Sequence, residues 1–182
     1  MANPRLAEAK KLAETGLYKT LPVSCELYSD FITPIEALSR LKTVSNHCYM
    51  LESAESSRRW GRYTFLGFDP AMELTFTDGM LKIRAGSSIA LEMKHPGNMI
   101  RQILADNRSP HFDGLPPFTG GFVGYFSYDY IKYAEPALVL DAKDEEGFRD
   151  VDLMLFDKVI AFDNFRQKVI LIVNARCEDM ET

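Results

Sequence analysis

The chain has 182 residues, of which 46% are hydrophobic and 12% aromatic, a composition typical of a globular domain with a sizeable core. Its net charge of −5 and isoelectric point of about 5.3 argue against a nucleic-acid-binding surface, which needs clustered lysine and arginine. The sequence contains no signal or transit peptide and no run of about twenty apolar residues. We therefore expect a cytoplasmic protein without a membrane span.

The cysteines and histidines predict neither a disulfide framework nor a metal site. The 3 cysteines are odd in number, lie far apart and include no Cys-x-x-Cys pair. The 3 histidines lack the spacing of metal ligands. A reducing compartment is consistent with this pattern.

The first half of the sequence predicts two helices and several extended segments. The helix over 33–42 has the clearest pattern: Thr33 can cap it, Pro34 fits its first turn and Glu36 completes a capping box. Its buried stripe is predicted to consist of Ile35, Leu38 and Leu41. The other predicted elements are a helix over 3–14 and extended runs over 18–30, 47–52, 62–68, 72–77 and 80–84, the last two joined by a tight Asp78-Gly79 turn.

The second half predicts a further helix, a glycine-rich strand and a C-terminal hairpin. The helix spans 96–108, and the glycine-rich strand within 119–133 turns into a short helix. Its glycines do not fit a phosphate-binding loop, so we interpret them as sites of close approach to a neighbouring strand. The hairpin pairs 151–162 with 169–174, and these nearly continuous apolar strands are expected to be covered on both faces. The whole pattern predicts one α+β domain over 1–182, mostly antiparallel sheet with two to four helices.

A carboxylate and a hydroxyl stand where the 47–52 run ends, at Glu52 and Ser53. Such a pair can hold an ammonium group, and Arg62 nearby can hold a carboxylate through its planar guanidinium. Ammonium and carboxylate together belong to a free α-amino acid. The ordinary alternative is a solvated turn, because a Glu-Ser pair at a strand end is most often exposed.

Three stretches then resemble one enzyme family. Residues 50–70, MLESAESSRRWGRYTFLGFDP, resemble the Leu-Leu-Glu-Ser … Gly-Arg-Tyr-Ser-Phe-Leu-Gly … Pro block of anthranilate synthase component I. Residues 120–136 and 151–173 resemble the second and third N-terminal blocks of that family, in the same order. Met50 replaces the first leucine, a swap that conserves side-chain volume.

The resemblance implies a regulatory role in tryptophan biosynthesis. The complete family protein is a lyase that uses magnesium and converts chorismate to anthranilate and pyruvate, with ammonia from a glutamine amidotransferase subunit. Tryptophan inhibits it, and the resemblance places Glu52 and Ser53 in the inhibitor site. Leu51 is expected as a wall of this site and Arg62 as the partner of the tryptophan carboxylate.

The resemblance also implies that the chain is incomplete as an enzyme. The family's chorismate-binding, magnesium-holding portion lies downstream of these blocks, so we expect the chain alone to be catalytically inactive and to hold no cofactor. It is then half of a two-layer sandwich, as an expressed fragment or a split gene product. Uncovered apolar strands are expected to make the isolated chain self-associate.

Three other interpretations remain open at this point. The chain could be the N-terminal portion of an aminodeoxychorismate synthase component I, a relative that shares the fold and parts of the blocks. It could be a non-enzymatic module that binds a free amino acid, which calorimetry with tryptophan would detect. It could also be a scaffold without any ligand.

Overall fold

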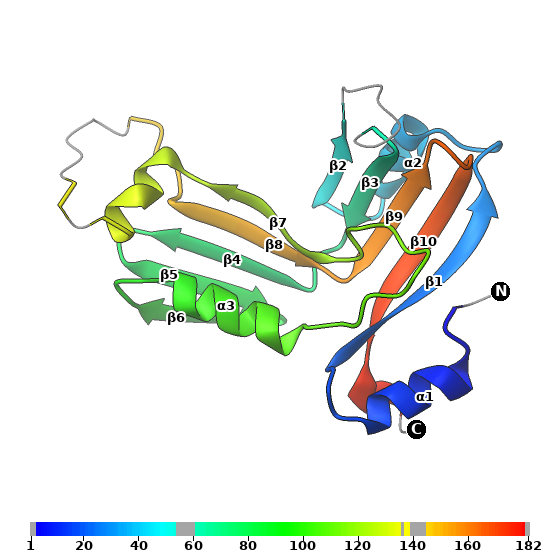
Figure 1. The fold of residues 1–182 in the computed structure, drawn as a ribbon. Helices are drawn as coiled ribbons and strands as arrows, with labels where there is room; N and C mark the ends of the chain where they lie inside the picture. The colour runs from blue at the N-terminus through cyan, green and yellow to red at the C-terminus, as the bar shows by residue number, and fades with distance from the viewer. Residues whose placement is uncertain (1–2, 54–60, 136, 139–144, 181–182) are drawn as a thin grey trace. The chain divides into compact units, whose positions relative to one another are not determined.

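The computed structural model describes residues 3–53, 61–135, 137–138 and 145–180 (Figure 1). Two antiparallel five-stranded sheets and several helices make this an α+β fold, as predicted. The chain divides into two compact units: residues 1–70, 106–121 and 156–182 form the first, and residues 71–105 and 122–155 form the second. The single domain expected over 1–182 stays a prediction.

The first unit contains a sheet with strand order β1-β10-β9-β3-β2. Antiparallel pairing joins all neighbours, and the β9–β10 hairpin is the one predicted from the sequence. Figure 1 shows β1 beside β10, although the two strands come from opposite ends of the chain. The strands are β1 (Thr20–Tyr28), β2 (Cys48–Glu52), β3 (Tyr63–Phe68), β9 (Lys158–Asp163) and β10 (Lys168–Arg176).

Helix α2 (Pro34–Leu41) covers part of one face of this sheet, which we call the α2 face. Its Ala37, Leu38 and Leu41 pack against Leu66 and Phe162 of the sheet. The backbone N–H of Glu36 donates to Thr33 Oγ1 at 3.2 Å, which confirms the predicted cap. The predicted capping box is not completed, because the Glu36 carboxylate accepts from Arg40 Nη2 at 2.7 Å instead. Ile35, predicted to be buried, is 69% exposed. The buried stripe contains Ala37 in place of Ile35, because residues 37, 38 and 41 share one side of the helix.

The opposite face of the same sheet carries a second core cluster. Its buried members come from the β9–β10 hairpin, and residues of the 109–118 loop pack on them. Strand alternation assigns the faces: residues paired across the strands share a face, and neighbours along a strand do not. The cluster contains Val159, Ala161, Ile170 and Ile172, with Phe65, Leu115 and Phe118 packed against it.

Helix α1 (Leu6–Glu14) and the short 3-10 helix η2 (Cys177–Met180) contact each other in the first unit. Ala9 is buried, and Gly16 follows the helical segment with a positive φ of 65°. A positive φ is easily reached only by glycine, which explains why the helix stops here.

The second unit contains a sheet with strand order β6-β5-β4-β8-β7 and a helix across one of its faces (Figure 1). Helix α3 (Gly97–Asp106) buries Ile100 and Ile103 against this sheet, beside Leu74, Phe76 and Leu81. The strands are β4 (Met72–Thr77), β5 (Met80–Ala85), β6 (Ser87–Glu92), β7 (Gly121–Phe126) and β8 (Val151–Phe156), and a 3-10 helix η1 (Tyr128–Tyr133) follows β7.

The glycines of β7 have the close-approach role predicted for them. A Cβ added at Gly124 would lie 2.9 Å from Leu153 Cα and closer still to the carbonyl oxygen of Asp152 in β8. The φ of Gly124 is 155°, at the limit of the region that other residues avoid. Strand β7 can therefore lie beside β8 only because this position has no side chain.

Two predictions about strands were wrong or incomplete. The run 151–162 is not one strand: β8 ends at Phe156, β9 begins at Lys158, and the two belong to different sheets. Strand β6 was not predicted, because its short segment mixes serine with isolated apolar residues. Among the described residues, no helix is both long enough and apolar enough to cross a membrane.

Candidate functional site

One end of the first sheet carries a row of polar side chains on the face opposite α2. Tyr28 pairs with Lys168, Lys168 with Asp163, and Asp163 with Tyr63, so one row crosses β1, β10, β9 and β3. Arg62 directly precedes Tyr63, the first residue of β3. The row brings together charges from sequence positions that are more than a hundred residues apart.

Arg62 and Asp163 form the best-defined ion pair of this row. Arg62 Nε donates to Asp163 Oδ1 at 3.0 Å, and Arg62 Nη2 donates to Asp163 Oδ2 at 2.6 Å. The Asp163 side chain is 0% exposed and that of Arg62 is 33% exposed. The rings of Tyr63 and Phe165 lie 4.8 and 5.8 Å from the guanidinium carbon. One edge of the guanidinium is thus fixed against a buried acid, with aromatic rings beside it.

Asp163 also organises the turn that follows it. The backbone N–H groups of Phe165 and Arg166 both donate to Asp163 Oδ1 at 3.1 Å. Burial alone would raise the pKa of this carboxyl, but the hydrogen bonds from Arg62 and from the backbone N–H groups outweigh burial and hold the pKa below its usual value. Asp163 is therefore a fixed negative charge near neutral pH.

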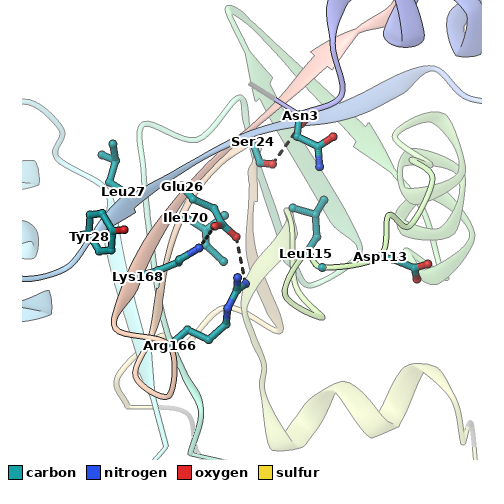
Figure 2. Close-up of a pocket in the computed structure, with 11 residues that line it drawn as sticks. Asn3, Ser24, Glu26, Leu27, Tyr28, Asp113, Leu115, Arg166, Lys168 and Ile170 are labelled. Atoms are coloured by element: carbon teal, nitrogen blue, oxygen red, sulfur yellow. Dashed lines mark hydrogen bonds and ion pairs between the residues drawn. The ribbon is translucent and has the colours of Figure 1, made fainter. Parts of the chain in front are cut away.

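A pocket of about 550 Å³ opens beside this row, over β1 and β10 (Figure 2). Glu26 stands in its wall and accepts hydrogen bonds from Lys168 Nζ and, at 3.2 Å, from Arg166 Nη1. Asp113 and Leu115 come from the 109–118 loop on the other side of the pocket. The other lining residues are Asn3, Ser24, Leu27, Tyr28, Gly114 and Ile170.

The charges in the pocket are largely matched with each other. Hydrogen bonds from Lys168, and the nearby charge of Arg166, hold the pKa of Glu26 below its usual value. Ser24 donates its hydroxyl to the carbonyl oxygen of Asn3 at 3.2 Å. Because both cations already contact Glu26, the pocket has no strong excess of charge that would select an anion.

The predicted site residues lie at the same end of the sheet as the polar row. Glu52 is the last residue of β2 and pairs with Thr64, two residues after Arg62, and Ser53 follows it directly. Glu52 and Ser53 are exposed, and Leu51 is 49% exposed. None of the three lines the 550 Å³ pocket. Residues 54–60, which include part of the family-like block, lie outside the described residues.

Strand alternation separates two of these residues. Leu51 pairs with Phe65 and points to the face opposite α2, whereas Glu52 pairs with Thr64 and points to the α2 face. The two side chains can therefore serve one ligand only beyond the end of the strand, where both faces are accessible. Arg62 already holds Asp163 through one edge, so a ligand carboxylate must use the other edge.

Sequence reasoning missed Asp163, Glu26, Arg166 and Lys168. Asp163 looked like an ordinary turn residue, since the sequence around it reads Asp-Asn-Phe between two apolar strands. Its partner Arg62 is 101 positions away, and only the pairing of β3 with β9 brings them together. The one local signal was an aspartate directly after a buried strand.

A metal centre is not evident in the part of the chain that the structure describes. Within those residues, no group of three or more His, Cys, Asp or Glu side chains could hold a metal ion.

Comparisons with known proteins give a consistent relationship. The chain is 34% identical over 176 residues to anthranilate synthase component 1 of Acetivibrio thermocellus, which covers 96% of this chain and 35% of that protein. It is also 34% identical to the Acinetobacter calcoaceticus protein of the same name, covering 97% of this chain and 36% of that protein. No family model matches the chain.

A solved structure agrees with these relatives. The crystal structure of anthranilate synthase component I from Streptococcus pneumoniae TIGR4 matches with a TM-score of 0.53 and 26% identity, over 84% of this chain and 32% of that one. The chain thus spans about 35% of the length of the curated relatives it matches. The resemblance recognised in the sequence is confirmed, and the chain is a homologue of anthranilate synthase component 1 over nearly its whole length.

Proposed function

We propose that this chain is the N-terminal, regulatory portion of an anthranilate synthase component 1. The observation that carries the proposal is the alignment of 96% of the chain with 35% of a protein of that name. The complete enzyme would convert chorismate, with ammonia derived from glutamine, to anthranilate and pyruvate. This chain would contribute regulation and no catalytic residue.

The proposed regulatory ligand is L-tryptophan, bound at the end of β2 and β3. Glu52 would accept hydrogen bonds from the ammonium group, with the Ser53 hydroxyl beside it, and Arg62 would hold the carboxylate. Leu51 would provide apolar contact for the indole ring. The geometry of Arg62 supports this assignment, because its guanidinium lies at the same sheet end as Glu52 and Ser53.

The site would be completed by protein beyond this chain. Glu52 and Ser53 are exposed here, whereas an amino-acid site buries most of its ligand. We propose that the remaining portion of the enzyme covers this end of the sheet and also holds the magnesium ion. A glutamine amidotransferase subunit would supply ammonia to the complete protein, which would work in the cytoplasm.

Exposed apolar side chains support the need for a covering layer. Leu27, Leu171 and Val173 all lie on the α2 face of β1 and β10, beyond the strands that α2 covers. Val173 is 48% exposed. Contiguous apolar surface of this kind favours association, so the isolated chain would self-associate.

The test is a Ser53→Phe substitution in the full-length protein. A bulky ring at the end of β2 should exclude tryptophan, relieve its inhibition and leave chorismate turnover unchanged. Ser88→Phe in β6 is the matched control, since Ser88 is also an exposed serine in the chain but lies in the second unit. An active Ser53→Phe enzyme that tryptophan inhibits as strongly as the wild type would refute the site.

A further inference from the structure

The guanidinium of Arg62 binds Asp163 through one edge, and its other edge is available for a second acceptor. The Nε and Nη2 atoms donate to Asp163, and Nη1 has no hydrogen-bond partner among the described residues. A guanidinium has donors on more than one edge in a fixed plane, so binding one acid leaves N–H groups for another. The N–H groups of Nη1 and Nη2 that do not donate to Asp163 lie together on the edge of the guanidinium turned away from Nε.

Asp163 is the group that fixes this orientation. It is fully buried, it belongs to the neighbouring strand β9, and two backbone N–H groups hold its Oδ1 atom in place. An acid held in this way cannot follow the arginine, so the arginine must align with the acid. The rings of Tyr63 and Phe165 further limit the positions that the guanidinium can occupy.

We infer that Asp163 is a positioning residue for amino-acid binding: Arg62 bridges two carboxylates, that of Asp163 through its Nε/Nη2 edge and that of the ligand through its Nη1/Nη2 edge. This inference rests on the proposed function, since it concerns the same tryptophan site. The bridge fixes the donors before the ligand arrives, and a preorganised donor loses less conformational entropy on binding.

If Arg62 bridges two carboxylates, a lysine at position 62 should not replace it. A lysine at position 62 would keep the charge but has no planar pair of edges. The buried Asp163 would then take the ammonium group, and the ligand carboxylate would lose its partner. Arg62→Lys should therefore behave like Arg62→Gln toward the carboxylate of the ligand.

The experiment measures carboxylate recognition in the full-length protein by calorimetry. L-Tryptophanamide keeps the indole ring and the amino group but lacks the carboxylate, so the ratio of its dissociation constant to that of L-tryptophan reports the carboxylate contact. We expect Arg62→Gln, Arg62→Lys and Asp163→Asn each to lower this ratio about 10-fold or more. The Asp163→Asn/Arg62→Gln double variant should be no lower than Arg62→Gln alone.

The control is Arg84→Gln, which removes the cation of an exposed ion pair with Glu73 in the second unit and should leave the ratio unchanged. An Arg62→Lys or Asp163→Asn protein with the wild-type ratio would overturn the inference. Should Asp163→Asn fail to fold, Arg62→Lys decides, because it changes no fully buried group. A wild-type protein that binds no tryptophan, or an unchanged affinity in Glu52→Ala, would overturn the proposed site itself and this inference with it.

Discussion

Gly67 of β3 faces the ring of Tyr49 across the strand pair, so a single methyl group there has a predictable effect. A Cβ added at Gly67 would lie 2.7 Å from Tyr49 Cζ and 2.9 Å from its hydroxyl oxygen. The ring cannot easily move away, because it packs edge-on against Phe156 with 4.7 Å between ring centroids. Gly67→Ala should therefore overpack this part of the first unit.

The magnitude follows from the two effects of the methyl group. Overpacking in a well-filled region costs about 1–3 kcal/mol. The φ of Gly67 is not positive, so alanine is compatible with the backbone and by itself stabilises by about 0.4–1 kcal/mol through the unfolded chain. The same substitution should thus destabilise the wild type and stabilise a Tyr49→Leu variant. The coupling free energy between the two positions should be roughly 1–3 kcal/mol, because the unfolded-chain effect is common to both backgrounds and cancels.

Urea denaturation followed by circular dichroism measures the free energy of unfolding for the four proteins of this cycle. Tyr49→Phe is the matched control, because the Tyr49 hydroxyl is buried without a hydrogen-bond partner among the described residues and burial raises its pKa well above the usual value. Removing that hydroxyl should change stability by less than about 1 kcal/mol and keep the clash. An equal cost of Gly67→Ala beside tyrosine and beside leucine would refute the steric explanation.

Three further predictions concern a backbone contact, a buried charge and an exposed face. Gly124→Ala should destabilise the β7–β8 pair by at least about 2 kcal/mol, because its Cβ would overlap the Asp152 carbonyl; unchanged hydrogen-exchange protection in β7 would contradict this. The pKa of Asp163 is lower in the folded than in the unfolded state, so its contribution is complete above about pH 4 and is lost as the pH falls through the folded value. The unfolding free energy of Asp163→Asn should therefore fall less than that of the wild type between neutral and acidic pH. An equal fall in the two proteins would contradict this role of Asp163. In a Leu171→Ser/Val173→Ser variant, the isolated chain should self-associate less, as measured by light scattering. The two substitutions should lower the unfolding free energy by less than about 1 kcal/mol per site. Undiminished association would exclude this face as the contact surface.

Local sequence signals predicted most elements of the fold. The Thr33 cap and Pro34 determine where α2 begins, and the Asp78-Gly79 dipeptide determines the β4–β5 turn, because these residues satisfy backbone groups or reach unusual φ values within their own segment. The glycines of β7 likewise predicted close strand contact. The helix cap and the turn depend on residues that are close in sequence, whereas Gly124 of β7 meets Asp152 of β8, a strand far away in sequence.

The apolar run 151–162 shows where that reasoning stops. Its composition is that of one long buried strand, yet β8 and β9 divide at Asp157 and join different sheets. A hydrophobic run predicts that a segment is buried, but it does not predict which strand the segment pairs with. The run is divided because β8 pairs with β4, whereas β9 pairs with β3 and β10.

The sequence by itself determined most of the elements, the α+β class and, through three blocks of residues, the relationship to anthranilate synthase component 1. It also predicted Glu52 and Ser53, neighbours at one strand end, as ligand-binding residues, and this stays a prediction. Only the tertiary structure decided that Arg62 is held by Asp163 and that Glu26 joins Lys168 and Arg166. The reason is physical: these contacts require β3 to pair with β9 and β1 with β10, and pairing between strands so far apart in the chain leaves no local pattern.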